Sequence, residues 1–275
     1  KNVGGKRMTQ FQTGAEAIGS LIGGNGGGSN KEKVEFTRLG EEPIKVRVKG
    51  PFDLMRYFAY GVHKQVNTFI AKNPPTYNKD GFASGNLTPW DKASDYYYKL
   101  AQKEPDKSAK RLELSALGYR FRAKPRYIMG FYDLESGKDI IVDFTKNQAM
   151  AVYSTIREYV ELDKQGNVID GGEHEIYDMA FKLSKKGSGT NTTGSLAPII
   201  NLSKGLTAEE QANLEASAGQ PFDTTMFDGV LYEMDEEEMT KSLVKADFDI
   251  SILGLTIGGS AAESNEAPAE DSFGF

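Results

Sequence analysis

The stretch YRFRAKPRYIMGFYDLESGKDIIVDF, residues 119–144, carries the strongest secondary-structure signal in this chain of 275 residues. Its first half alternates between residue types and predicts a strand over 119–131, because successive side chains of a strand point to opposite faces. Residues 133–138 are rich in turn-forming types, and residues 139–144 return as a second strand. The hairpin predicts a fold with a mainly β core.

The first strand of this hairpin also predicts a basic surface. In an extended chain Arg120, Arg122, Lys124 and Arg126 share one face, and the aromatic residues between them share the other. Four like charges spaced ~6.6–7 Å apart repel one another, and a polyphosphate backbone would offset that repulsion. The alternative is an edge strand that its charges protect from pairing with other chains.

Strand patterns also precede the hairpin. Residues 44–49 alternate strictly, which places Lys45, Arg47 and Lys49 on a second basic face. Further strands are expected over residues 55–60 and 62–71.

The region 73–118 changes to helical periodicity, so we expect it to be an insertion into the β framework. Thr88 is a good N-cap and is followed by proline, which predicts a helix over 88–102. A second helix is expected over 108–117, ended by Gly118.

The C-terminal half predicts a mixture of helices and strands. The expected elements are a helix after the hairpin, a strand over 174–183, a polar loop over 185–194, a helix that begins at Thr207, and an acidic helix over 231–246.

Charge is sorted along the chain. Residues 31–128 carry 20 Lys and Arg against 11 Asp and Glu, whereas residues 129–275 carry 10 against 27, and the net charge is −6. A basic body with an acidic tail that ends in aromatic residues is typical of proteins that bind single-stranded nucleic acid.

Composition argues against catalysis and against metal or membrane binding. Cysteine is absent, the two histidines (His63 and His174) have no ligand spacing, and no phosphate-loop, hydrolase or metalloprotease motif occurs. Acid pairs such as Asp139 and Asp143 are expected on a solvated hairpin. No apolar stretch approaches the ~20 residues that span a bilayer. We therefore expect no enzyme, no cofactor, no metal, no membrane partner and a cytoplasmic location.

Cations and aromatic rings together form the pool of candidate contacts to single-stranded DNA, because cations neutralise phosphates and rings stack on bases. The alternative for each single ring is an ordinary place in the core. The candidates are Lys45, Arg47, Lys49, Arg56, Tyr57, Phe58, Tyr60, Lys64, Trp90, Tyr97, Tyr98, Lys99, Arg120, Arg122, Lys124, Arg126, Lys185 and Lys186.

In the order and character of its segments, the chain resembles the phage helix-destabilising, single-stranded-DNA-binding proteins of the T-even type. The matching segments are the basic arm Lys6-Arg7-Met8-Thr9, the strands over 45–71, the insertion at 73–118, the hairpin and helix from Tyr119, the strand and loop over 181–194, and the acidic tail. The final Phe273-Gly274-Phe275 also resembles the tip of bacterial single-stranded-DNA-binding proteins. That family holds its inserted subdomain with a Cys/His zinc site, which this chain lacks, so the zinc role does not carry over; proline-stiffened loops and a buried Trp90 are expected in its place.

The resemblance implies an OB-fold, a five-stranded Greek-key barrel, over residues 34–245. Residues 1–33 would be a flexible arm that associates with neighbouring copies through Lys6 and Arg7; the alternative is a disordered end without function. Residues 246–275 would be a regulatory tail that recruits polymerase, helicase or primase through Glu270, Asp271, Phe273 and Phe275, unless the apolar run 250–257 docks as a strand.

The implied function is cooperative, sequence-independent protection of single-stranded DNA in phage replication, recombination and repair. Two alternatives remain at this point. An RNA-binding chaperone would use the same groove, and a structural adaptor would need no nucleic acid at all.

Overall fold

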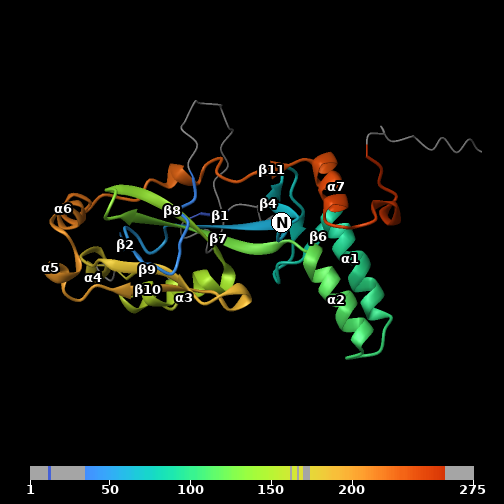
Figure 1. Ribbon diagram of the computed structural model, residues 1–275, viewed down its shortest axis with the longest axis horizontal. Coiled ribbons are helices and arrows are strands. Elements are labelled where there is room, and N and C mark those ends of the chain that lie inside the picture. Colours follow the sequence, from blue (N-terminus) through green and yellow to red (C-terminus); the bar gives the residue numbers. More distant parts are fainter. Residues whose placement is uncertain (1–11, 14–34, 162, 166, 170–173, 258–275) are drawn as a thin grey trace, which may run out of the picture.

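The computed structural model describes residues 12–13, 35–161, 163–165, 167–169 and 174–257. Figure 1 shows an α+β fold with a mainly β core, which confirms the predicted class. Nine described strands form one mixed sheet: β1 (Gln12–Thr13), β2 (Ile44–Arg47), β3 (Leu54–Val62), β4 (Val66–Ala71), β7 (Lys124–Asp133), β8 (Lys138–Thr145), β9 (Phe181–Lys186), β10 (Thr193–Pro198) and β11 (Glu233–Met234). A separate small hairpin consists of β5 (Thr76–Tyr77) and β6 (Ala83–Gly85).

Helices connect and cover these strands. The α-helices are α1 (Pro89–Gln102), α2 (Ala109–Phe121), α3 (Lys146–Glu158), α4 (His174–Tyr177), α5 (Leu202–Gly205), α6 (Ala208–Ala216) and α7 (Glu236–Lys245). Short 3₁₀ helices are η2 (Gly189–Asn191), η3 (Thr224–Phe227) and η4 (Ile250–Leu253). None of the described helices is both long and apolar enough to cross a membrane.

Strand β7 is the branch point of the sheet. One of its edges pairs antiparallel with β8 from residue 126 to residue 133. The other edge pairs with β3 through residues 124–129 and with β2 through residues 132–133. The sheet therefore divides into one branch through β2, β9 and β10 and another through β3, β4 and β11.

The first branch surrounds the largest hydrophobic core. Phe131 of β7, Phe144 of β8 and Phe181 of β9 are fully buried there with Val152 of α3. Helix α3 packs against β7, β8 and β10, and β8 is not paired with β10 among the described residues. The sheet is thus not a closed barrel, and the predicted OB-fold is not confirmed.

The predicted hairpin is present, but its first strand begins later than expected. Residues 119–121 form the last turn of α2, and β7 begins at Lys124. The buried residues of α2 are Leu114, Gly118 and Phe121, whose spacing of four and three is helical. Gly118 does not end the helix; a Cβ there would lie 2.9 Å from the Tyr98 ring, so this glycine allows α2 to pack closely on α1.

The expected insertion lies between β4 and β7 and contains β5, β6, α1 and α2. As predicted, Thr88 caps α1, and Asp91 completes a capping box. Trp90 is fully buried, and its indole N–H donates to the Ser242 hydroxyl of α7 at 2.9 Å. The α1–α2 pair projects from one end of the molecule in Figure 1.

The C-terminal part of the described chain packs against this insertion. Phe248 is 3% exposed and its ring contacts those of Tyr96, Tyr97 and Phe121. The boundary expected at residue 246 therefore falls inside the folded region, and the apolar run from Ile250 begins with η4, not with a strand.

Two further sequence expectations were wrong. The strand expected over 174–183 is replaced by α4 followed by β9, and the loop expected over 185–194 contains the end of β9 and the start of β10. In β9, Phe181 and Leu183 are buried at alternate positions, which is the pattern of a strand with one buried face. Lys6, Arg7, Glu270, Asp271, Phe273 and Phe275 lie outside the described residues, as does nearly all of the predicted arm and the end of the predicted tail.

Candidate nucleic-acid interface

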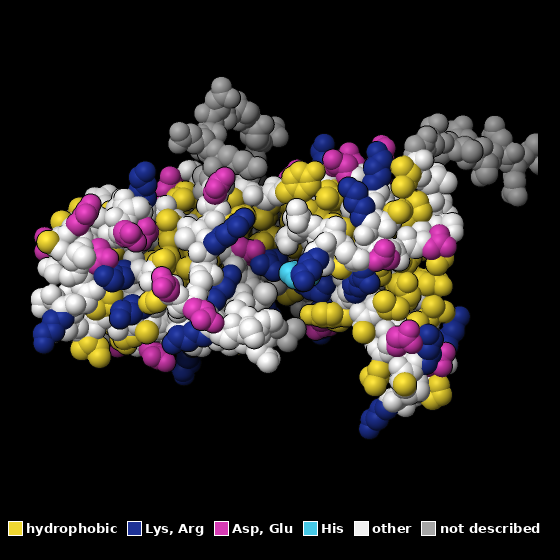
Figure 2. Space-filling view, viewed as in Figure 1, with side chains coloured by type: hydrophobic (Ala, Val, Ile, Leu, Met, Phe, Trp, Pro, Cys, Tyr) yellow, Lys and Arg dark blue, Asp and Glu magenta, His cyan; other side chains and the backbone are white. Residues whose placement is uncertain are grey.

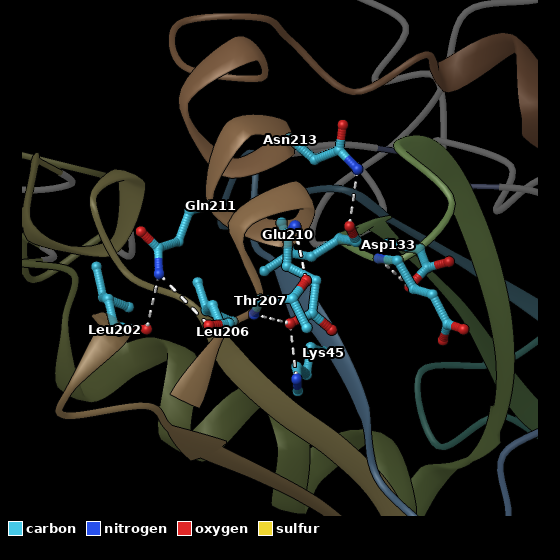
Figure 3. Close-up of polar contacts among 10 residues, drawn as sticks. Lys45, Asp133, Leu202, Leu206, Thr207, Glu210, Gln211 and Asn213 are labelled. Atoms are coloured by element: carbon cyan, nitrogen blue, oxygen red, sulfur yellow. Dashed lines mark hydrogen bonds and ion pairs between the residues drawn. The ribbon is translucent and has the colours of Figure 1, made fainter. Parts of the chain in front are cut away.

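The basic face predicted on β2 is neutralised by the protein itself. The Lys45 ammonium lies 2.7 Å from the Glu210 carboxylate (Figure 3). Glu210 also accepts the Thr207 backbone N–H in the capping box of α6. Hydrogen bonds from Lys45 and Thr207 hold the pKa of the Glu210 carboxyl below its ordinary value, against burial, which raises it.

Of the two other cations of this face, Arg47 is buried and Lys49 is half-buried. Arg47 is 4% exposed, and its guanidinium donates to the Leu214 and Tyr177 carbonyls and to the Ser217 hydroxyl at 3.0 Å. The Lys49 ammonium pairs with Asp139 at 2.8 Å. Lys45, Arg47 and Lys49 therefore do not form an unpaired basic face in this structure, because they join the β2 region to segments far along the chain. Their predicted contact with phosphates stays a prediction.

The basic face predicted on the hairpin strand is also divided. Arg126 makes a bidentate contact with Asp143, and its Nε lies 3.1 Å from both carboxylate oxygens. The Tyr57 hydroxyl donates to the same carboxylate. Arg120, at the end of α2, donates to the Ala246 carbonyl at 2.9 Å and lies 3.7 Å from Asp247. Neither cation belongs to an unpaired row on one strand.

Most of the aromatic candidates are core residues. Trp90, Tyr57, Phe58 and Tyr60 are between 0 and 4% exposed, so none presents a ring face to a base. Tyr60 donates its hydroxyl to the buried Asp91 carboxylate at 2.8 Å. In this structure the four rings take the core alternative, and their predicted stacking on bases stays a prediction.

The remaining candidates lie at the surface or partly exposed. Tyr97 and Tyr98 are half-buried on α1, and Lys99 pairs with Asp95 on the same helix. The ammonium of Lys185 donates to the Asp143 carbonyl at 3.4 Å. Lys64 and Lys186 are exposed.

Cations and exposed rings do converge where β7 follows α2. We call this set the junction surface: Arg56, Phe82, Tyr119, Arg122 and Lys124. The Arg122 guanidinium carbon lies 4.6 Å from the centroid of the Phe82 ring and 5.4 Å from that of Tyr119. The Lys124 ammonium lies 4.9 Å from the Tyr119 centroid. The Phe82 and Tyr119 side chains are 45% and 53% exposed.

Arg56 joins the junction surface from β3. Its guanidinium carbon lies 4.8 Å from the centroid of the Phe58 ring. Gly81, next to Phe82, has a φ of +81°, and a Cβ there would lie 3.5 Å from the Phe58 ring and 3.9 Å from the Arg56 guanidinium. The Asn78 side chain accepts the Phe82 N–H at 2.9 Å and so holds this turn over β3. Figure 2 shows Lys and Arg side chains along the middle of the molecule, over the region where Figure 1 places this junction.

The electrostatics of the junction surface distinguish it from the other basic clusters. Within the described ranges, no ion pair joins Arg56, Arg122 or Lys124 to a carboxylate. The Nε atoms of Arg56 and Arg122 are buried and have no hydrogen-bond partner there. Burial lowers the pKa of the Lys124 ammonium to about 8, and the neighbouring Arg122 charge contributes to this shift. Arg122 and Lys124 thus share the Tyr119 ring without an opposite charge, which an anionic ligand would supply.

The sequence pattern indicates the cations of this surface but not its rings. The alternation over residues 119–131 predicts Tyr119 on a strand face opposite the charges, and it gives no indication of Phe82. A glycine-flanked aromatic in a polar turn, as in Asp80-Gly81-Phe82, is the signal that would have indicated an exposed ring.

Comparison with known proteins identifies no relative. No protein-family model, no curated protein and no solved structure matches the chain.

Proposed function

We propose that this protein binds single-stranded DNA without sequence preference, through the junction surface. The observation that carries the proposal is a pair of cations, Arg122 and Lys124, that contact the exposed rings of Phe82 and Tyr119 and have no carboxylate partner within the described ranges. Arg56, over the buried Phe58 ring, is a third cation without such a partner. Cations that track phosphates, together with rings that stack on bases, are the usual means by which single strands are bound. Such contacts tolerate any sequence, because every base has a π face and every nucleotide a phosphate.

The strand order supports the same proposal. The strands β2, β7, β8, β9 and β10 occur in this order along the chain, with β3 to β6 and two helices between β2 and β7. Their spatial order is β8-β7-β2-β9-β10. An OB-type barrel that is open between β8 and β10, where α3 packs, would have this arrangement. Strands 2 and 3 of that fold carry oligonucleotides, and the corresponding strands here are β7 and β8. Lys124 is the first residue of β7, so the junction surface lies at one end of that pair.

We place this activity in phage DNA replication, recombination and repair, on the resemblance of segment order described above. Binding would be cooperative if the N-terminal arm contacts a neighbouring copy.

The test is binding of a fluorescently labelled oligothymidylate to a triple variant, Arg56→Gln, Arg122→Gln and Lys124→Gln. We expect its affinity at low salt to fall at least tenfold. The matched control replaces three exposed lysines elsewhere, Lys103→Gln, Lys138→Gln and Lys204→Gln, which changes the net charge equally and should retain most of the affinity.

Competitors complete this test. Duplex DNA should compete poorly with the labelled single strand. Equal competition by a matched RNA oligomer would favour the RNA-binding alternative. Wild-type affinity in the triple variant would contradict the proposed surface, and no binding by the wild-type protein would favour an adaptor.

A further inference from the structure

An apolar hollow lies beside the junction surface, between β7 and α3. Its volume is about 210 Å³, roughly seven times the ~30 Å³ that a water molecule occupies in the liquid. Buried side chains from three elements form its floor: Leu54, Met129 and Ala149. Its walls are more exposed and consist of Tyr127, Met150 and Tyr153.

The hollow is continuous with the junction surface through two paired strands. Arg56 is directly opposite Tyr127 in the antiparallel register of β3 and β7, so the two side chains lie next to each other on one face. Leu54 and Arg56 alternate along β3 and share that face as well. A ligand bound at Arg56 therefore lies next to Tyr127, which lines the hollow.

One cation stands among the apolar lining. Lys146, the first residue of α3, lines the hollow and is exposed, and it has no ion pair within the described part of the chain. The apolar lining suits a flat, weakly polar group, and the cation at its edge suits a phosphate attached to that group. Tyrosine and methionine walls suit such a group, because thioethers and aromatic rings both contact π systems favourably.

We propose that this hollow receives one nucleobase of the bound single strand, with Lys146 contacting the adjoining phosphate. This inference rests on the proposed function and adds a base-binding subsite to it. Met150 is 58% exposed and an unbranched side chain of this kind adjusts to different ring sizes, so we expect the subsite to accept purines and pyrimidines alike.

The experiment compares two ligands of equal phosphate number. One is an oligothymidylate of about 16 nucleotides, the upper end of the usual site size for one OB-type domain; the other is the same backbone with every base removed. The variants are Ala149→Leu, which fills the hollow, and Met150→Ala, which removes one wall. Ile200→Ala is the control, because Ile200 is 96% exposed and does not line the hollow.

We expect the wild-type protein to prefer the base-containing oligomer about tenfold. Ala149→Leu and Met150→Ala should each reduce this preference about fivefold without changing the affinity for the abasic oligomer. An unchanged preference in both variants would overturn the inference. The triple variant of Arg56, Arg122 and Lys124 should lose affinity for both oligomers. If it keeps that affinity, the proposed function fails, whatever the variants of the hollow show.

A crosslinking measurement on the wild-type protein covers the case in which a variant does not fold. An oligothymidylate with 5-iododeoxyuridine at single positions should crosslink, on irradiation, to Tyr127 or Tyr153. Crosslinks to Tyr119 or Phe82 alone would overturn the subsite while supporting the junction surface.

Discussion

At the scale of single residues, the local sequence pattern predicts which cations share a strand face. It does not predict which of them are free to bind a ligand. Lys45 and Arg47 alternate on β2 and Lys49 follows that strand, yet their partners Glu210, Leu214 and Asp139 lie far along the chain. No periodicity within residues 44–49 encodes those contacts. The availability of Arg56, Arg122 and Lys124 could be learned only from the folded arrangement.

Lys124 should make DNA binding depend on pH. Its pKa in the free protein is lowered to about 8 by burial, with a contribution from Arg122, and a bound phosphate would raise it towards the ordinary value of ~10.4. The complex then holds a proton that the free protein has released, so affinity should fall as the pH rises from about 7 to about 9. Lys124→Arg keeps the charge and should remove this dependence. The same pH dependence in Lys124→Arg would show that another group is responsible.

Asp53 should make stability depend on pH in the opposite sense to most carboxylates. Burial raises its pKa to about 7, Asp139 adds to the shift, and Lys49 opposes it. Between about pH 4 and 7 the folded protein holds a proton that the unfolded chain has lost, so this group lowers stability progressively as the pH rises through that window. Asp53→Asn should therefore be more stable than the wild-type protein at pH 8. Urea unfolding of both proteins at pH 5 and pH 8 measures the difference. If the free energy of unfolding falls equally in both proteins between pH 5 and pH 8, Asp53 is not the responsible group.

At the scale of elements, capping residues and turns were predictable because their interactions are local. Thr88, the 133–138 turn and Thr207 all behave as their sequences indicate. The boundary between α2 and β7 was not predictable, since residues 119–122 alternate like a strand while Leu114, Gly118 and Phe121 follow a helical spacing. Packing of α2 on α1 decides between the two patterns.

Substitution of Gly118 tests the packing of α2 on α1 directly. Alanine in a helix interior normally stabilises by ~0.5–1 kcal/mol relative to glycine. Here the new Cβ would meet the Tyr98 ring at 2.9 to 3.0 Å, so we expect Gly118→Ala to destabilise by ~1–3 kcal/mol. Chemical denaturation measures this change. Combining it with Tyr98→Ala should recover part of the loss, and a more stable Gly118→Ala protein would contradict the close packing of α1 and α2.

At the scale of the whole molecule, residues 246–248 complete the aromatic core of the insertion, because Phe248 packs against its rings. Its burial could not be inferred from a stretch whose acidic residues resemble those of the following tail. Within described residues 246–257, Phe248 and Ala246 are the buried ones. The Phe248 ring contacts Phe121, and the Ala246 carbonyl accepts from Arg120, more than a hundred positions earlier.

Two truncations test this role. Removing residues 246–275 deletes Phe248, and loss of a buried phenylalanine costs ~3–5 kcal/mol. Removing residues 258–275 retains it. We expect the longer truncation to be less stable than the shorter one by at least ~3 kcal/mol, measured by urea unfolding. Equal stability of the two truncated proteins would show that the segment does not support the fold.

The most direct test of the central claim is the salt dependence of oligothymidylate binding. Each phosphate contact on a single strand contributes about −0.7 to the slope of log affinity against log salt concentration. Replacing Arg56, Arg122 and Lys124 together by glutamine should make the slope shallower by about 2, while the Lys103, Lys138 and Lys204 control keeps the wild-type slope. A triple variant with the wild-type slope would show that the bound strand does not contact the junction surface.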